Sequence, residues 1–133
     1  MRDLEKMFKP DSVGVIGASN TPDKVGHIVV SNLIEDGYKG EIYPINPKGG
    51  EILGLKAYTD VTQCPTVPDL VVVVVPSKAV NPSVKQCGEL GVKNVVVITA
   101  GFKEIGGDGV KLEEELVRLA NEYDISLIGP NSL

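Results

Sequence analysis

Residues 70–77 read LVVVVVPS, and this stretch decides the fold. Its leucine and five valines form an uninterrupted apolar run that stops at Pro76. A run without polar alternation is typical of a strand that is buried on both faces of a parallel sheet. A second run of this kind, NVVVIT, follows at 94–99. The two runs therefore predict two buried strands of a parallel sheet.

Shorter apolar runs on either side complete the set of predicted strands. Residues 13–17 (VGVIG) and 42–45 (IYPI) precede the first run, and the proline of the second segment predicts a brief or irregular strand. A weak extended segment is expected near 55–58. A last short strand is expected at 126–128, ending in a loop at 129–131.

Amphipathic segments alternate with these strands. Apolar residues recur three and four apart in 24–36, which predicts a helix that Gly37 closes. Another apolar stripe predicts a helix over 110–123, with Glu114 and Arg118 paired four apart on its polar side.

Between the two long apolar runs, the sequence predicts a turn at 77–80 and then a helix. Asn81 is expected to cap this helix, with Pro82 in its first position and Gly91 at its end. Strand and helix then alternate along the whole chain. This order predicts a single α/β domain over 1–133, Rossmann-like and doubly wound, with a mainly parallel sheet and helices on both faces.

The composition limits the classes of function. The chain has 133 residues, a net charge of −5 and only 5% aromatic residues, which argues against a nucleic-acid groove or a base-stacking platform. No apolar run approaches the roughly 20 residues that cross a bilayer, and no signal peptide is visible. Cys64 and Cys87 lack a metal-binding spacing, so we expect reduced thiols, no metal site and a cytoplasmic protein.

Loops that follow the strands of a parallel sheet gather at one edge, where ligands bind. These loops carry glycines, small hydroxyl and amide side chains, and lysines, although the chain as a whole is acidic. Such groups suit a phosphorylated ligand at a helix N-terminus. The loops span residues 17–26, 46–50, 76–78, 100–102 and 129–132.

The first of these loops does not contain the dinucleotide fingerprint G-x-G-x-x-G, since the next glycine after Gly17 is Gly26. No acidic residue follows the second strand to hold a ribose diol; the sequence there is Asn46-Pro47-Lys48. A lysine cannot accept a hydrogen bond but can neutralise a phosphate. This pattern favours a nucleotide with an extra ribose phosphate, and both coenzyme A and NADP fit that description.

Six segments in order carry a resemblance to a known family. They are VGVIGAS (13–19), Pro22-x-Lys24-x-Gly26, IYPINPK (42–48), VVPS (74–77), ITAGF (98–102) and GPNS (129–132). Over essentially all 133 residues the sequence resembles the N-terminal CoA-binding domain of ADP-forming acyl-CoA synthetases, relatives of the succinyl-CoA synthetase alpha subunit. Ser132 stands where that family has cysteine.

The resemblance implies a role for each matching position. The loop of Gly17, Ala18, Ser19 and Asn20 would lie against the nucleotide and diphosphate of coenzyme A, and Lys48 would be the CoA-binding lysine. Val75, Pro76 and Ser77 would flank the adenine or the pantetheine arm, while Ala100, Gly101 and Asn131 would line the route to the thiol. The full set of expected binding residues is Gly17, Ala18, Ser19, Asn20, Lys24, Gly26, Asn46, Pro47, Lys48, Val75, Pro76, Ser77, Ala100, Gly101 and Asn131.

The resemblance also implies partners. The family reaction converts acyl-CoA, ADP and phosphate to acid, CoA and ATP through a phosphohistidine that lies in a following domain. We therefore expect part of a longer protein, inactive alone, that works with further domains or with a beta (ATP-grasp) subunit. His27 lies outside that catalytic context and is expected to pack or to make a minor ligand contact.

Two other functions stay open at this point. One is a regulatory module that senses CoA or another nucleotide, such as the same domain fused to a protein acetyltransferase. The other is an NADP-binding oxidoreductase domain, which Lys48 permits but the glycine pattern does not favour. No catalytic residue is assigned, because the serines of the loops lack His and Asp partners.

Overall fold

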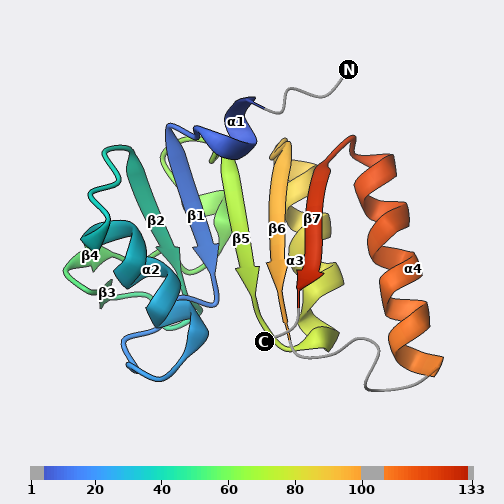
Figure 1. Cartoon of the computed structure of the whole chain (residues 1–133), viewed down its shortest axis with the longest axis horizontal. Helices are drawn as coiled ribbons and strands as arrows, with labels where there is room; N and C mark the ends of the chain where they lie inside the picture. The colour runs from blue at the N-terminus through green and yellow to red at the C-terminus, as the bar shows by residue number, and fades with distance from the viewer. Residues whose placement is uncertain (1–4, 100–106, 132–133) are drawn as a thin grey trace.

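Five parallel strands form the central sheet of the computed structural model, which describes residues 5–99 and 107–131 (Figure 1). Their order across the sheet is β2-β1-β5-β6-β7, and every pairing is parallel. The parallel sheet predicted from the valine runs is thus confirmed. The strands are β1 (Ser12–Ile16), β2 (Glu41–Ile45), β5 (Leu70–Val74), β6 (Asn94–Ile98) and β7 (Ser126–Asn131).

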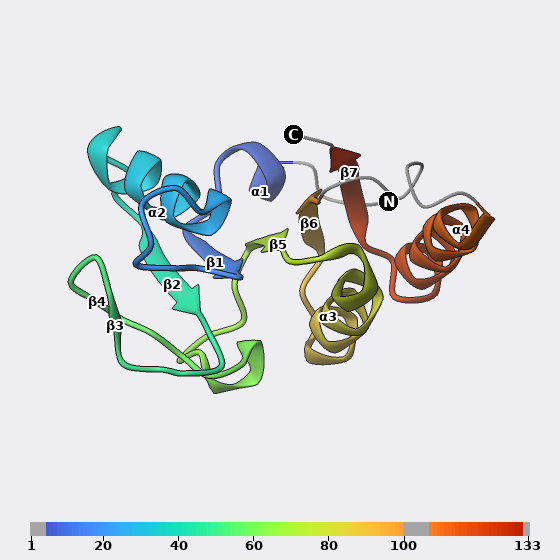
Figure 2. The ribbon, with the colours of Figure 1, turned by 90° about the horizontal axis from the view of Figure 1, so that it is seen from below.

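Helices cover both faces of this sheet, as predicted. Helix α2 (Val25–Glu35) lies on one face, and α3 (Ser77–Leu90) and α4 (Gly107–Glu122) lie on the other, as the view along the strands shows (Figure 2). One apolar cluster fills each face: Val30 belongs to the cluster under α2, and Val84 and Leu116 belong to the cluster under α3 and α4. Within the described residues, no helix has the length and apolar character needed to cross a membrane.

The predicted start of α3 is wrong. The helix begins at Ser77, so the expected turn at 77–80 is helical, Asn81 is buried within the helix and Pro82 lies inside it. The reason is the inward stripe of the helix, which starts at the fully buried Val80 and not one turn later. Asn81 donates from Nδ2 to the carbonyl of Leu112 in α4 at 3.0 Å, so it joins two helices and does not cap one.

Other boundaries differ from the prediction in smaller ways. Helix α4 begins at Gly107, and Arg118 pairs with Glu115 and Glu122 and not with Glu114. A hairpin of β3 (Glu51–Ile52) and β4 (Leu55–Lys56) precedes a short 3₁₀ helix at Val61–Gln63, where one weak extended segment was expected.

Two strand predictions also need correction. Strand β2 keeps a regular register with β1 through Pro44. Because β2 is an edge strand of the five-stranded sheet, the N–H that Pro44 lacks costs no hydrogen bond between strands. Strand β7 continues through Gly129, Pro130 and Asn131, which were expected to form a loop; a register shift between Val96 and Ile98 accommodates the extension.

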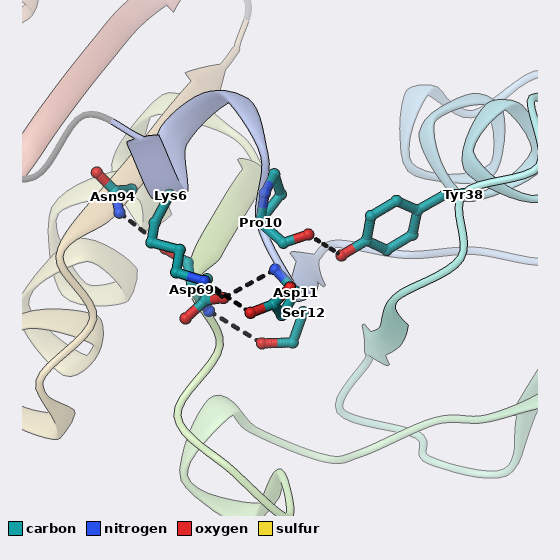
Figure 3. A network of polar contacts seen from close by, with 7 residues as sticks. All are labelled: Lys6, Pro10, Asp11, Ser12, Tyr38, Asp69 and Asn94. Carbon is teal, nitrogen blue, oxygen red and sulfur yellow. Dashed lines mark hydrogen bonds and ion pairs between the residues drawn. The ribbon is translucent and has the colours of Figure 1, made fainter.

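The amino ends of the strands are tied together by a polar network around Asp69 (Figure 3). The Asp69 carboxylate accepts from the backbone N–H of Asp11 at 2.8 Å, and its own backbone N–H lies 3.0 Å from the Ser12 hydroxyl. Lys6, in the short helix α1 (Glu5–Phe8), pairs with Asp11 at 2.6 Å. This network joins the segments that enter β1 and β5 at the amino edge of the sheet.

On the sheet face that α2 covers, apolar side chains become more exposed to solvent from β1 toward β7. Val15, Val72, Val96 and Ile128 stand side by side in register on β1, β5, β6 and β7. Val15 is 0% exposed and Val72 8%, whereas Ile128 is 39% exposed. This row of apolar side chains is therefore buried on β1 and β5 and partly exposed on β7.

Candidate functional site

A cleft of about 560 Å³ lies at the carboxyl ends of the central strands. It sits where the strand order reverses, between β1 and β5, which is the position at which open α/β sheets bind ligands. Among the described residues that line it, Lys24 alone carries a formal charge. The lining consists of Gly17, Ala18, Ser19, Lys24, Val25, Gly26, Asn46, Val74, Val75, Pro76, Ile98 and Thr99.

Two glycines bring the first loop tightly against the start of α2. Gly17 has a φ of +96°, and a Cβ there would lie 1.8 Å from the carbonyl oxygen of Val74. A Cβ on Gly26 would lie 1.9 Å from the carbonyl oxygen of Gly17. Any side chain at either position would push the loop away from the strand or the helix. The two glycines thus perform the tasks of tight turn and close helix approach, although their spacing is not that of the dinucleotide fingerprint.

The amino end of α2 faces this cleft without a capping side chain. Lys24 is the N-cap residue, its backbone is extended, and its side chain makes no cap hydrogen bond. The first backbone N–H groups of a helix have no partner inside the helix and carry partial positive charge. This end of α2, with the Lys24 ammonium beside it, is therefore suited to an anion such as a diphosphate.

Side chains around the first loop fix its shape. The Nδ1 atom of His27 lies 3.0 Å from the carbonyl oxygen of Ser19, and the Ser19 hydroxyl accepts from the backbone N–H of Thr21 at 3.0 Å. Asn46 donates from Nδ2 to the carbonyl of Ala18 at 2.9 Å. His27 thus contacts the backbone of the loop, and whether it also contacts a ligand stays open.

Asn20 holds a second element beside the loop. Its Nδ2 donates to the carbonyl of Glu51 at 2.7 Å, and its Oδ1 accepts from the backbone N–H of Leu53 at 3.1 Å. Both partners belong to the hairpin of β3 and β4. Asn20 is not among the residues that line the cleft, and its contact with the nucleotide stays a prediction.

The remaining predicted residues lie at the rim or outside the description. Pro47 and Lys48 are exposed just beyond Asn46, and the Lys48 N–H donates to the Asn46 Oδ1 at 2.8 Å. Ser77 opens α3 next to Pro76. Ala100 and Gly101 lie outside the described residues, as does Ser132. Asn131 ends β7 beside Ile98, and its side chain is not described.

Sequence reasoning missed Val25, Val74, Ile98 and Thr99 among the lining residues. Thr99 is buried, and its hydroxyl donates to the carbonyl of Val75 at 2.8 Å, which fixes the end of β6 against the end of β5. Val74, Ile98 and Thr99 could have been found from their position in the sequence. They end buried strands, and the last residues of such strands reach the same edge of the sheet as the loops that follow. Val25 follows from its place in the first turn of α2.

Neither thiol is suited to chemistry in the cleft. Burial raises the pKa of Cys64 to about 11 and that of Cys87 to about 12, and both are free cysteines outside the lining. Across residues 5–99 and 107–131, no three His, Cys, Asp or Glu side chains are grouped so that they could hold a metal ion. Among the described residues, the cleft thus offers an anion the backbone N–H groups at the start of α2 and the Lys24 ammonium.

Known proteins match this chain over nearly its whole length. A family model described as a CoA binding domain matches residues 11–133. The alpha subunit of acetate–CoA ligase (ADP-forming) I from Pyrococcus furiosus is 47% identical over 132 residues, which cover 96% of this chain and 29% of that subunit. The 4-hydroxybutyrate–CoA ligase (ADP-forming) of Nitrosopumilus maritimus is 39% identical over 127 residues, covering 96% of this chain and 18% of that ligase.

Among solved structures, the dinucleotide-forming acetyl-coenzyme A synthetase 1 of Ca. Korarchaeum cryptofilum, in complex with phosphate and ADP, is similar with a TM-score of 0.92. It shares 47% sequence identity, and the match covers 98% of this chain and 28% of that one. The chain thus spans less than a third of the length of each of these relatives.

Proposed function

This chain belongs to the CoA-binding domain family, and on that premise we propose that the cleft holds coenzyme A. The close approach of Gly17 to Gly26, with Lys24 beside it, carries the proposal. These residues bring loop backbone, a helix N-terminus and a positive charge to one point of a cleft at the switch point of the sheet. These groups suit a diphosphate, and coenzyme A contains one.

The polar end of coenzyme A is assigned to the loops of β1 and β2. The diphosphate lies along Gly17, Ala18 and Ser19 at the start of α2, where Lys24 neutralises part of its charge. The 3′-phosphate of the ribose lies within reach of Lys48, an exposed residue two positions after the lining residue Asn46. A lysine ammonium is a suitable partner for this terminal phosphate.

The less polar parts are assigned to the ends of β5 and β6. Val75, Pro76 and Ser77 flank the adenine or the pantetheine arm, and the lining side chains of Val74 and Ile98 add apolar surface there. The route to the thiol is assigned to Ala100, Gly101 and Asn131.

We further propose that the domain supplies CoA binding to an ADP-forming acyl-CoA synthetase in the cytoplasm. Phosphoryl transfer and ATP binding would belong to other domains or to a beta subunit. The names of the relatives cite different acids, acetate and 4-hydroxybutyrate, although each matches 96% of this chain. The choice of acid is therefore assigned to parts of those enzymes outside this domain.

Calorimetric titration of the 133-residue protein with CoA, dephospho-CoA and NADP tests the ligand. We expect CoA to bind about tenfold more tightly than dephospho-CoA, the size of one charge-assisted contact. Lys48→Ala should remove that difference. Lys39→Ala, an exposed lysine after the other end of α2, is the matched control and should preserve it.

Two results would count against these assignments. If NADP binds more tightly than CoA, the assignment of coenzyme A to the cleft is wrong. If Lys48→Ala leaves the ratio of CoA to dephospho-CoA affinity unchanged, Lys48 does not bind the 3′-phosphate.

A further inference from the structure

The side chain of Asn46, directly after β2, bonds to two segments of the proposed CoA site. Its Nδ2 donates to the carbonyl of Ala18 in the first loop at 2.9 Å. Its Oδ1 accepts from the backbone N–H of Lys48 at 2.8 Å. Asn46 is half-buried and belongs to the lining of the cleft. One end of its amide thus holds the first loop, and the other holds the turn that carries Lys48.

The turn that carries Lys48 is fixed by three local constraints. The backbone N–H of Gly49 donates to the carbonyl of Asn46 at 2.8 Å, which closes a four-residue turn. Pro47 occupies the second position of this turn, and proline fixes its own φ. The bond from the Lys48 N–H to the Asn46 Oδ1 spans the same residues. The backbone of Lys48 therefore has a fixed place relative to the Asn46 side chain.

The first loop is attached to the same end of β2. The backbone N–H groups of Gly17 and Ala18 donate to the carbonyl of Ile45 at 3.1 and 3.3 Å. Asn46 follows Ile45, and its own N–H donates to the carbonyl of Tyr58 at 2.8 Å. The backbone of Asn46 is therefore held in place, so that its side chain fixes the first loop and the turn relative to each other.

Coenzyme A carries its diphosphate and its 3′-phosphate on one ribose, so the separation of these two groups varies little. A site that binds both must hold its own two anion-binding groups at a matching separation. We propose that Asn46 is the positioning residue that sets this separation, because it joins the loop assigned to the diphosphate to the turn that carries Lys48. The inference rests on the proposed function and deepens it. Asn46 determines the preference for a ligand with a 3′-phosphate, and it does so through Lys48.

Calorimetric titration of the 133-residue protein with CoA and with dephospho-CoA measures this preference as a ratio of two affinities. A loss of folded protein lowers both affinities by the same factor and leaves the ratio unchanged. The unsubstituted protein should prefer CoA about tenfold. Asn46→Ala should reduce the ratio to about twofold or less, although Lys48 is still present. A ratio that stays near tenfold in Asn46→Ala would overturn the proposal.

Asn94→Ala is the matched control for the loss of an asparagine. Asn94 also donates from Nδ2 to a backbone carbonyl, that of Asp69 at 3.0 Å, but it begins β6 at the opposite edge of the sheet. This variant should keep the tenfold ratio, whatever its stability. A ratio that falls as far in Asn94→Ala as in Asn46→Ala would show a general effect of lost hydrogen bonds, and the proposal would fail.

Asn46→Ser separates the two bonds of the asparagine without a change of charge. A serine hydroxyl can accept from the N–H two residues later, but the shorter side chain has no group at the position of Nδ2. The variant therefore keeps an acceptor for the Lys48 N–H and loses the bond to Ala18. The ratio should fall in Asn46→Ser as it does in Asn46→Ala. A serine variant that keeps the tenfold ratio would show that the bond to Ala18 is not needed, and would refute the proposal.

Lys48→Ala in the Asn46→Ala background tests whether the two residues act together. If Asn46 acts through Lys48, the second substitution should change the affinity for CoA by less than about twofold there, against about tenfold in the unsubstituted protein. Equal effects in the two backgrounds would overturn the inference. If Lys48→Ala leaves the ratio unchanged in the unsubstituted protein, the assignment of Lys48 to the 3′-phosphate fails, and this inference fails with it. A ratio that Lys48→Ala abolishes and Asn46→Ala preserves refutes the role of Asn46 alone.

Discussion

Replacing Gly26 by alanine tests the contact on which the cleft depends. Gly26 is the second residue of α2, and its neighbour across the contact is the carbonyl oxygen of Gly17. A Cβ would stand 1.9 Å from that oxygen and 3.1 Å from the Cα of Ala18. Both neighbours are backbone atoms, so no side-chain rotation can relieve the overlap.

The size of the effect follows from two opposing contributions. Alanine is favoured over glycine within a helix by about 1 kcal/mol. Overpacking costs about 1 to 3 kcal/mol, and a rigid backbone neighbour at 1.9 Å places Gly26→Ala at the upper end. We therefore expect the free energy of unfolding to fall by about 2 kcal/mol, the cost of about 3 less the gain of about 1.

Urea unfolding followed by circular dichroism at about 222 nm measures this change through the helical signal. The matched control is Gly14→Ala in β1, where a Cβ would meet only side chains at 3.4 to 3.5 Å, an ordinary contact distance. That variant should be as stable as the parent or slightly more so. If Gly26→Ala stays within about 0.5 kcal/mol of the parent, the close approach of loop and helix is not as described. Its affinity for CoA should also fall, because the displaced atoms belong to the loop of Gly17, Ala18 and Ser19 that we propose binds the diphosphate.

Three further outcomes are expected. Asn20→Ala should lower the free energy of unfolding by about 1 to 2 kcal/mol through the loss of two hydrogen bonds to the hairpin, and an unchanged urea midpoint would contradict that role. Asp69→Ala should cost about 1 kcal/mol or more by leaving the N–H of Asp11 without its acceptor, again measured in urea; no loss would mean that the amino-edge network is not stabilising. Because folding raises the pKa of Cys64 to about 11 and of Cys87 to about 12 from the ordinary value of 9.0, the unfolded chain loses these protons first. Stability should therefore be full below about pH 9 and fall as the pH rises above it, and a double Cys→Ala variant should lose less between about pH 8 and pH 10; an equal loss would refute the linkage.

Much of the fold could be predicted because local signals agreed with it. The valine runs gave the two buried strands in the right places, and the glycines that end α2 and α3 both have positive φ, as a helix end requires: Gly37 at +76° and Gly91 at +103°. The start of α3 could not be placed in this way. Pro82 is a strong local signal for a first helical position, but burial of Val80 against the sheet extends the helix one turn earlier.

The site was predicted less completely, because its shape depends on contacts between distant segments. The sequence shows a glycine at 26, but only the folded chain brings it against the carbonyl of Gly17. The sequence likewise does not reveal that the Asn20 side chain bonds to a hairpin more than thirty residues away. Ile98 and Thr99 could not be predicted from the loops alone, because the residues at the end of a strand also reach the cleft.

The increase in side-chain exposure from β1 to β7, on the sheet face that α2 covers, has a consequence for local unfolding. Among the strands that the structure describes, β7 has a neighbour on one side only, and Ile128 in it is 39% exposed, whereas Val15 in β1 is 0% exposed between two neighbours. Local opening costs least where few apolar contacts are lost. Backbone amides should therefore exchange with deuterium fastest in β7 and slowest in β1 and β5. The sheet would then open first at β7, while β1, which precedes the loop of Gly17, Ala18 and Ser19, and its neighbour β5 stay closed.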